Sequence, residues 1–267
     1  MTTEIPPPPR FFGLDIHKRY LVAVAVDPAG KRIYGPRRVA WSDLESWRDK
    51  TLTRHDALVI EMITNTWQVY DELVPYVHSV TVVHPPHVRL VTEPRVMNDR
   101  IAAFNLAVLL SKDMLKGIWI PTPEVRERRA LIAQRSKMTR LATQAKNRLH
   151  AVLHRRHILP GEGDLFHPDR RSWWLALPIS SVEMMRVLSD LDTLAFARKQ
   201  LANFEDGLHQ IAAGEPRLPL LLQLPGFGVL NSLTVLAAIG VSHGIRVNVL
   251  ISVVGKGIVR FRNSGVR

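Results

Sequence analysis

The first forty residues carry apolar, β-branched runs that predict three neighbouring β-strands. Residues 11–18 read Phe-Phe-Gly-Leu-Asp-Ile-His-Lys, and residues 20–26 are almost wholly apolar up to a turn signal at Asp27-Pro-Ala-Gly30. A third β-prone run over residues 31–39 follows this turn. Since short apolar runs separated by such turns are typical of antiparallel hairpins, we expect a three-stranded meander.

Helices and further strands alternate after this meander. Ser42 and Glu45 form a capping-box pattern, which predicts that a helix begins at Ser42 and ends near residue 52. Two nearly continuous apolar runs, over residues 57–63 and 80–84, predict buried strands. Patterns of helical period over residues 66–78 and 98–116 predict two further helices. The order βββαβαβ is that of an α/β, RNase H-like domain, which we place at residues 11–121.

Two long helical patterns fill the middle of the chain. In the first, over residues 123–157, apolar residues recur every seven positions, at Leu131, Met138, Ala145 and Val152. This spacing predicts a long helix with a coiled-coil-like seam. A second helix is predicted over residues 181–213 and can pair antiparallel with the first. We therefore expect residues 122–214 to form a helical coiled-coil region, as a spacer or a dimerising arm.

A Pro-Gly-x-Gly motif precedes the last strong helical pattern. It lies in Leu224-Pro-Gly-Phe-Gly228, between two apolar segments. Gly226 and Gly228 would let a turn approach a phosphate, and the amides at the next helix start would point toward it. This pattern predicts a helix-hairpin-helix-like motif in a small, mostly α-helical C-terminal domain at residues 215–267. A tight αα-hairpin with a packing role only is the alternative.

Charge and composition narrow the possible partners. The 267 residues hold 36 Lys and Arg against 24 Asp and Glu, which gives a net charge of +12 and a pI near 10.5. Such an excess favours a polyanion, and nucleic acid is favoured over a membrane surface because no basic helix carries a matching apolar face with aromatic anchors. The absence of Cys excludes disulfides and zinc–thiolate sites, and it fits a reducing interior.

From the apolar runs and the first residues of the sequence, we expect neither a membrane span nor a secretory signal. No apolar run is long enough to span a bilayer. Residues 1–10, with four successive prolines, lack the basic start and apolar core of a secretory signal. We expect them to form a disordered or polyproline arm.

The helix predicted over residues 123–157 is strongly basic. Only Glu124 and Glu127 oppose its many Arg and Lys residues, and both lie at its start. Helix faces that only contact water usually carry both positive and negative side chains. The excess of positive charge on this helix therefore favours contact with nucleic-acid phosphates over simple exposure to solvent. The candidate contacts are Arg135, Arg140, Lys146 and Arg148.

Three carboxylates lie where the predicted fold could bring them together. Asp15 lies in an apolar strand, Glu61 in a second buried strand, and Asp99 in the first turn of a helix that would pack on the sheet. Each has an ordinary explanation: a satisfied Asp at a strand end, a Glu that faces water, or compensation of the helix dipole. A buried carboxylate is costly unless it is paired or bound to a metal, and Mg²⁺ prefers oxygen ligands. The three together predict a Mg²⁺ site for phosphoryl transfer.

A serine near the end of the sequence is a further candidate. Ser264 precedes Gly265 and has Arg260, Arg262 and Arg267 near it, so it could act as a nucleophile beside a phosphate. Taken alone, a serine in such a place is more often an ordinary loop residue.

Seven motifs together resemble one family of proteins. They are Gly13-Leu-Asp-Ile-His-Lys18, Val59-Ile-Glu61, Val82-Val-His-Pro85, Asn98-Asp-Arg-Ile-Ala-Ala-Phe-Asn-Leu-Ala107, Ala145-Lys-Asn-Arg-Leu-His150, Leu224-Pro-Gly-Phe-Gly228 and Asn263-Ser-Gly265. The combination resembles the DEDD-type transposases of insertion sequences, also called bridge-RNA-guided recombinases, over most of the chain from about residue 11.

This resemblance implies a DNA transposase or site-specific recombinase that works as a homo-oligomer with a structured guide RNA. It implies a RuvC-like N-terminal domain that binds Mg²⁺ through Asp15, Glu61 and Asp99, and a C-terminal transposase domain with Ser264 as the nucleophile. The basic segment 145–150 adds Asn147 to the nucleic-acid candidates. The expected location is the bacterial cytoplasm, with the chromosome as the target.

Two departures from the family pattern leave alternatives open. The family's fourth acid falls on Ala102, one helical turn after Asp99, and alanine cannot bind a metal. The sequence stops three residues after Ser264, where family members usually continue, so we expect a copy that is decayed, truncated or deliberately inactivated. The alternatives are a non-catalytic nucleic-acid-binding remnant, an RNase H-like junction endonuclease that uses acids only, and a structural coiled-coil protein.

Overall fold

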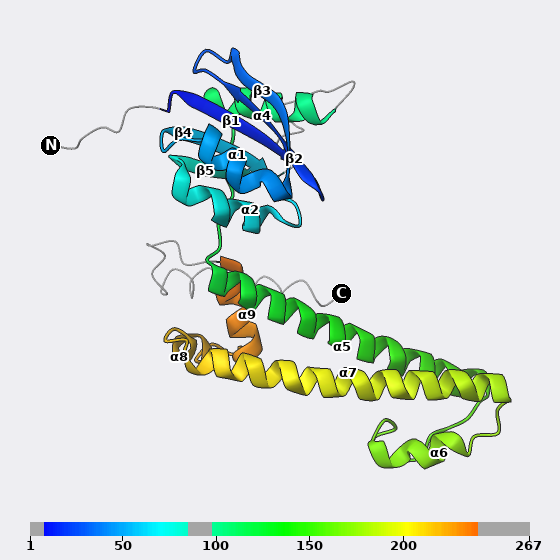
Figure 1. The fold of residues 1–267 in the computed structure, drawn as a ribbon. Coiled ribbons are helices and arrows are strands. Elements are labelled where there is room, and N and C mark those ends of the chain that lie inside the picture. Colours follow the sequence, from blue (N-terminus) through cyan, green and yellow to red (C-terminus); the bar gives the residue numbers. More distant parts are fainter. Residues whose placement is uncertain (1–7, 85–97, 240–267) are drawn as a thin grey trace, which may run out of the picture. The chain divides into compact units, whose positions relative to one another are not determined.

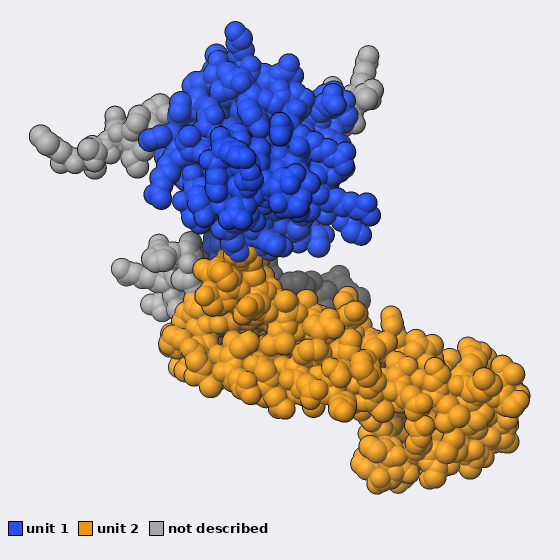
Figure 2. Space-filling model, in the orientation of Figure 1, with its two compact units in different colours: residues 1–120 blue, residues 121–267 orange. Residues whose placement is uncertain are grey.

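Five β-strands form one mixed sheet in the first of two compact units, which comprise residues 1–120 and 121–267 (Figure 2). The computed structural model describes residues 8–84 and 98–239. The strands are β1 (Arg10–Ile16), β2 (Tyr20–Val26), β3 (Arg32–Ala40), β4 (Asp56–Glu61) and β5 (Ser79–Val83). Their order is β3-β2-β1-β4-β5; β1, β2 and β3 pair antiparallel, and β1, β4 and β5 pair parallel. This sheet confirms the predicted meander and is consistent with an RNase H-like α/β core.

Helices cover both faces of this sheet (Figure 1). One face is covered by α1 (Leu44–Thr51) and α2 (Thr66–Leu73), which pack over Phe12 and Leu14. A short turn, η2 (Val74–Tyr76), follows α2. On the other face lies α4 (Asp99–Ser111), against β1 and β2. Because successive side chains of a strand point to opposite faces, the odd-numbered positions of β1 face α4.

The backbones of β1 and α4 touch at Gly13. A Cβ atom added there would lie 2.0 Å from the carbonyl oxygen of Ala103 and 2.6 Å from the amide nitrogen of Ala107. Both are main-chain atoms of α4, so no change of side-chain rotamer could make room. Gly13 therefore sets how closely α4, with Asp99 at its first position, packs on the sheet.

The start of α1 differs from the prediction. A 3₁₀ turn, η1 (Trp41–Asp43), precedes the helix, and no side chain caps either element. The Ser42 hydroxyl instead donates to the carboxylate of Asp43, over 3.2 Å. The capping-box prediction is wrong because this extra turn moves the helix start beyond Ser42.

The first strand begins earlier than predicted. Arg10, which the prediction placed in the Pro-rich arm, is the first residue of β1 and donates two hydrogen bonds of 2.7 Å to the buried carboxylate of Asp56. A fully buried carboxylate is costly without a charged or hydrogen-bonding partner, and the pair with Asp56 holds Arg10 against β4. Residues 1–7 of the predicted arm lie outside the described residues.

Two long helices run side by side in opposite directions in the second unit (Figure 1). They are α5 (Pro123–Arg155) and α7 (Ser181–Ala213), and both lie where the sequence predicts them. Met138, Ala145 and Val152 of the predicted seam are buried. Between the two helices, a short turn, η3 (Pro168–Arg170), leads into α6 (Arg171–Leu175). The coiled-coil geometry and the division at residues 214 and 215 stay predictions.

The Pro-Gly-Phe-Gly segment joins two shorter helices, α8 (Leu218–Leu222) and α9 (Val229–Ile239). Gly226 has a φ of +82°, a left-handed conformation that favours glycine. A Cβ atom at Gly226 or Gly228 would meet none of the described residues within 4 Å, so none of them fills the space beside the turn. Its helix-hairpin-helix-like role stays a prediction.

A buried carboxylate joins the start of α5 to the segment after α7. The side chain of Glu215 is only 3% exposed, and it accepts hydrogen bonds from Arg217 and, over 2.9 Å, from Arg128 of α5. The bonds from Arg217, with a smaller effect of Arg128, lower the pKa of Glu215 from 4.5 to about 2.

We expect the second unit to lose this contribution in acid. Because the folded-state pKa is lowered, the stabilisation is fully present above about pH 4.5 and declines as the pH falls toward 2. Glu215→Gln should lower the free energy of unfolding at pH 7 by about 2 kcal/mol, since water partly screens the exposed side of Arg217. Urea unfolding at pH 7 and at pH 3 measures this effect, and the difference between Glu215→Gln and the parent should shrink at pH 3.

Glu205→Gln is the matched control. Glu205 also pairs with an arginine of α5, Arg135, but its side chain is 46% exposed. Exposed pairs contribute little, so this variant should lose at most about 0.5 kcal/mol. An equal loss in both variants would contradict the role assigned to Glu215.

Candidate metal centre

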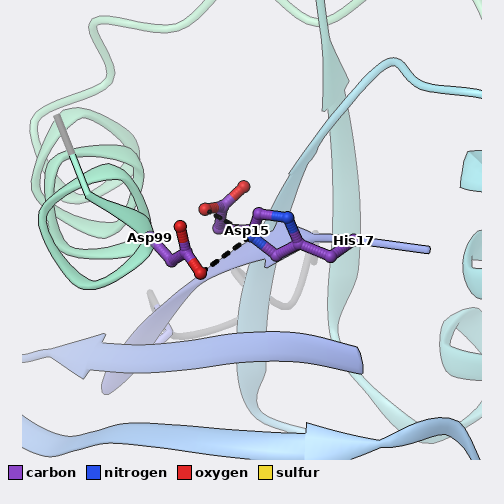
Figure 3. Close-up of side chains that lie close together, drawn as sticks. All are labelled: Asp15, His17 and Asp99. Carbon is purple, nitrogen blue, oxygen red and sulfur yellow. Dashed lines mark hydrogen bonds and ion pairs between the residues drawn. The ribbon is translucent and has the colours of Figure 1, made fainter. Parts of the chain in front are cut away.

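Two carboxylates and an imidazole converge on the face of the sheet that α4 covers (Figure 3). Asp15 lies near the end of β1, His17 follows in the turn toward β2, and Asp99 is the first residue of α4. Their ligand atoms all lie within 4.8 Å of one another. Within residues 8–84 and 98–239, no other group of three His, Cys, Asp or Glu side chains meets this criterion. We refer to these three residues as the Asp–His–Asp cluster.

His17 bridges the two carboxylates. Its Nε2 atom lies 3.1 Å from Oδ2 of Asp15 and 3.3 Å from Oδ2 of Asp99. All three side chains are partly exposed, and Asp15 is the least exposed at 19%. A solute can therefore reach the cluster.

The environment of Asp15 suits a cation. Burial raises the pKa of the Asp15 carboxyl; the charge and the hydrogen bond of His17 lower it, and the charge of Asp99 raises it further. A cation beside both carboxylates would offset the burial and relieve their mutual repulsion. Carboxylate oxygens with one imidazole are ligands that hard or borderline divalent ions such as Mg²⁺ and Mn²⁺ accept. The residues present therefore fit a divalent metal.

Tyr20, at the start of β2, fixes the position of Asp99. Its hydroxyl donates to Oδ2 of Asp99 over 2.9 Å, and its ring stacks on that of His17 with centroids 4.7 Å apart. The hydrogen bond to Asp99, with a smaller effect of partial burial, raises the pKa of the Tyr20 hydroxyl. Asn98 secures the same end of α4, since its side chain accepts the amide hydrogen of Ile101 over 3.0 Å.

Glu61, the third predicted ligand, lies on the same face but outside the 4.8 Å group. β1 and β4 pair in parallel with Leu14 opposite Ile60, so Glu61 follows beside Asp15 at the same end of the sheet. Val59 packs against α4, and the alternation of side chains places Glu61 on that face as well. The fold thus brings the carboxylates of Asp15 and Asp99 to within 4.8 Å of each other and leaves Glu61 as a neighbour on the next strand.

Comparison with known protein families identifies a transposase family with an acidic site. The family model of the IS110-type DEDD transposases matches residues 12–158, more than half of the chain. The chain belongs to this transposase family. The matched segment contains all three predicted acids of the IS110-type site, and the family implies DNA as the substrate. No curated protein matches the chain. None of the helices in the described part of this transposase is long and apolar enough to span a membrane.

The family resemblance predicts the fourth acid of the site at Ala102, and this assignment stays a prediction. Ala102 lies on α4 three residues after Asp99, and its amide donates to the carbonyl oxygen of Asn98 over 2.9 Å. Positions three apart on a helix lie on the same side, so an acid here would lie near Asp99. The methyl group of Ala102 offers no ligand.

Two of the basic residues predicted to contact nucleic acid pair with acids of α7. Arg135 lies 2.6 Å from a carboxylate oxygen of Glu205, and Arg148 lies 2.7 Å from one of Asp190. The charge imbalance of α5, which supported the prediction, is therefore partly balanced by its partner helix. In each pair one side chain is about half exposed to water, which weakens the pair, so a phosphate could still compete for these arginines.

The remaining candidates on α5 have other surroundings. Arg140 and Asn147 are exposed. The ammonium group of Lys146 lies 5.4 Å from the centroid of the Phe166 ring. Ser264, the predicted nucleophile, lies outside the described residues. All these assignments stay predictions for this transposase.

His17 and Tyr20 are the site residues that sequence reasoning missed. His17 follows Asp15 by two positions, the spacing at which strand residues share a face, and this spacing was the available signal. The contact of Tyr20 with Asp99 joins residues 79 positions apart, and no local pattern in the sequence indicates it.

Proposed function

We propose that this transposase cuts and rejoins DNA by metal-assisted phosphoryl transfer at the Asp–His–Asp cluster. The observation that supports this proposal is the convergence of two carboxylates, from β1 and from α4, at a partly exposed site that suits a divalent cation. Mg²⁺ is the proposed ion, since it prefers oxygen ligands. Glu61 is the proposed additional ligand.

The residues of the cluster hold one another in place before substrate binds. Asp15 and Asp99 would hold the cation, and His17 and Tyr20 keep the two carboxylates oriented. The bound cation would supply positive charge for the phosphoryl oxygens in the transition state. Groups that are already oriented need little rearrangement during the reaction, and this lowers its barrier.

Ser264 is the proposed nucleophile, as the family resemblance implies. Its Oγ atom would bond to the phosphorus of the scissile phosphodiester while the bond from phosphorus to one deoxyribose oxygen breaks. The serine proton passes to solvent, and the departing oxygen takes up a proton. A DNA hydroxyl then attacks the protein–DNA link, which rejoins the DNA and restores the serine.

A structured guide RNA and a homo-oligomer complete the proposal. The net charge of +12, the exposed Arg140 and Asn147, and the open turn at Gly226 and Gly228 support contact with nucleic-acid phosphates. A catalytically inactive, nucleic-acid-binding form is the second candidate function. Ala102 favours it, because the fourth ligand is missing from α4.

A DNA excision assay in cells, with the matching element and its non-coding ends supplied, tests these proposals. We expect Ala102→Asp to raise the yield of recombined junctions at least about tenfold, because it adds a carboxylate one helical turn from Asp99. Ala102→Asn is the matched control, since it has nearly the same shape without the charge.

The outcomes separate the candidates. Junctions that require Ala102→Asp would identify the chain as an inactive form. Loss of junctions in Ser264→Ala would support the serine nucleophile, whereas DNA cutting that persists in Ser264→Ala would favour a junction endonuclease. Absence of junctions and of DNA cutting in every variant would overturn the proposed function.

A further inference from the structure

A cavity of about 350 Å³ adjoins the Asp–His–Asp cluster. Tyr20 and Arg38 line it from the sheet, and Asn98, Asp99 and Arg100 line it from the start of α4. Asp99 belongs to both the cavity and the cluster. Two arginines therefore lie at a cavity that opens directly beside the proposed metal ligands.

Arg38 lies in the same row of the sheet as Asp15. β3 and β2 pair Arg38 with Val22, and β2 and β1 pair Val22 with Asp15. Residues directly opposite one another share a face, so this row runs across three strands on the face that α4 covers. Two strand spacings, roughly 10 Å, separate the backbones of Arg38 and Asp15.

The ring of Tyr20 holds the guanidinium of Arg38. The Cζ atom of Arg38 lies 3.7 Å from the ring centroid. The same ring stacks on His17, and its hydroxyl binds Asp99. Tyr20 thus links Arg38 to the cluster, and no carboxylate among the described residues forms an ion pair with Arg38.

We propose that Arg38, stacked on Tyr20, binds the phosphate next to the scissile phosphodiester and positions the DNA strand at the cluster. A guanidinium presents its N–H donors in a planar fork that matches two phosphate oxygens. Stacking occupies a flat face of this group and leaves its N–H edges available to a ligand. This role rests on the proposed function and names the residue that orients the substrate there.

A binding measurement with a matched pair of variants tests this role. The probe is a short labelled duplex of the element end, bound to the full chain together with the guide RNA of the element, with Ca²⁺ in place of Mg²⁺. Arg38→Gln is expected to weaken binding about tenfold and to reduce the slope of log K against log salt by about 1. Arg37→Gln is the control, because Arg37 is the adjacent exposed residue of β3 and points to the opposite face. It should change the affinity by less than about twofold.

Replacing single phosphates of the probe by neutral methylphosphonates identifies the partner of Arg38. One replacement, next to the scissile position, should weaken binding by the parent and by Arg37→Gln about tenfold. The same replacement should not weaken binding by Arg38→Gln further, since the contact is already lost. Arg38→Lys keeps the charge without the fork, so its affinity should lie between those of the parent and Arg38→Gln.

Two results would overturn this inference. One is equal affinity of Arg38→Gln and Arg37→Gln when both variants unfold at the temperature of the parent. The other is undiminished sensitivity of Arg38→Gln to the methylphosphonate. Failure of the proposed function gives a different result. In the excision assay, Asp15→Asn would then yield as many recombined junctions as the parent does. Arg38→Gln and Arg37→Gln could still differ in their affinity for the DNA probe.

Discussion

Asp15→Asn is expected to reduce metal-dependent DNA cutting by about a thousandfold or more while the first unit stays folded. The substitution removes one of the charged groups that would hold the cation, and loss of about 4 kcal/mol of transition-state stabilisation corresponds to that factor. Burial penalises the charged form of Asp15, so a neutral side chain should leave the melting temperature unchanged or higher. Cutting of the element-end duplex is measured with purified protein. Asp15→Asn is introduced into whichever of two parent proteins cuts DNA, the chain as given or its Ala102→Asp variant.

Asp113→Asn is the control for this experiment. Asp113 follows α4, at the other end of the helix from Asp99, and it is exposed. Its φ is +53°, a conformation that Asn adopts readily, so the change should be silent in both assays. Undiminished cutting by Asp15→Asn would remove this carboxylate from the mechanism. A similar loss of cutting in Asp113→Asn would mean that the effect reflects net charge rather than the site.

Gly13→Ala is expected to lower the free energy of unfolding of the first unit by about 3 kcal/mol. The added Cβ would lie 2.0 Å from a carbonyl oxygen of α4, so the helix must move away from β1. We expect Mn²⁺ to raise the melting temperature of the parent by binding the cluster, and since α4 carries Asp99, Gly13→Ala should abolish this rise. Urea unfolding and a thermal-shift titration with Mn²⁺ measure the two effects.

Gly161→Ala provides the comparison for Gly13→Ala. A Cβ at Gly161 would lie 4.0 Å from its nearest neighbour, a side-chain nitrogen of Arg170. This variant should differ from the parent by less than about 0.5 kcal/mol. If Gly13→Ala unfolds at the same urea concentration as Gly161→Ala, the tight contact between β1 and α4 is not what positions Asp99.

The sheet was predictable because its signals are local. Apolar runs and turn residues mark β1 to β5 in the sequence, and the helix patterns place α2, α4, α5 and α7 within a few residues of their observed positions. Asp15 and Asp99 were predictable for a related reason. A carboxylate in an apolar strand and another at the start of a helix that packs on that strand are unusual enough to be noticed.

The remaining features depend on contacts between distant residues. Arg148 meets Asp190 42 positions away, and Arg135 meets Glu205 70 positions away, so the charge of α5 could not be judged from α5 alone. Ser42 failed as a helix cap because a 3₁₀ turn, which has no strong sequence signal, intervenes before α1. His17 lies within a recognised motif, yet its role between two carboxylates appears only once α4 has packed on the sheet.

The contact between Tyr20 and Asp99 spans 79 positions, and this separation affects a newly made chain. During synthesis, the β-hairpin with Asp15 and His17 emerges long before α4, so the growing polypeptide carries only part of the centre. The pairing that completes it is a long-range contact, which forms late because it requires closure of a large loop. An incomplete polypeptide would therefore be unable to perform the proposed reaction on the DNA nearby, and a chain whose α4 opens transiently would lose that capacity until the helix closes again.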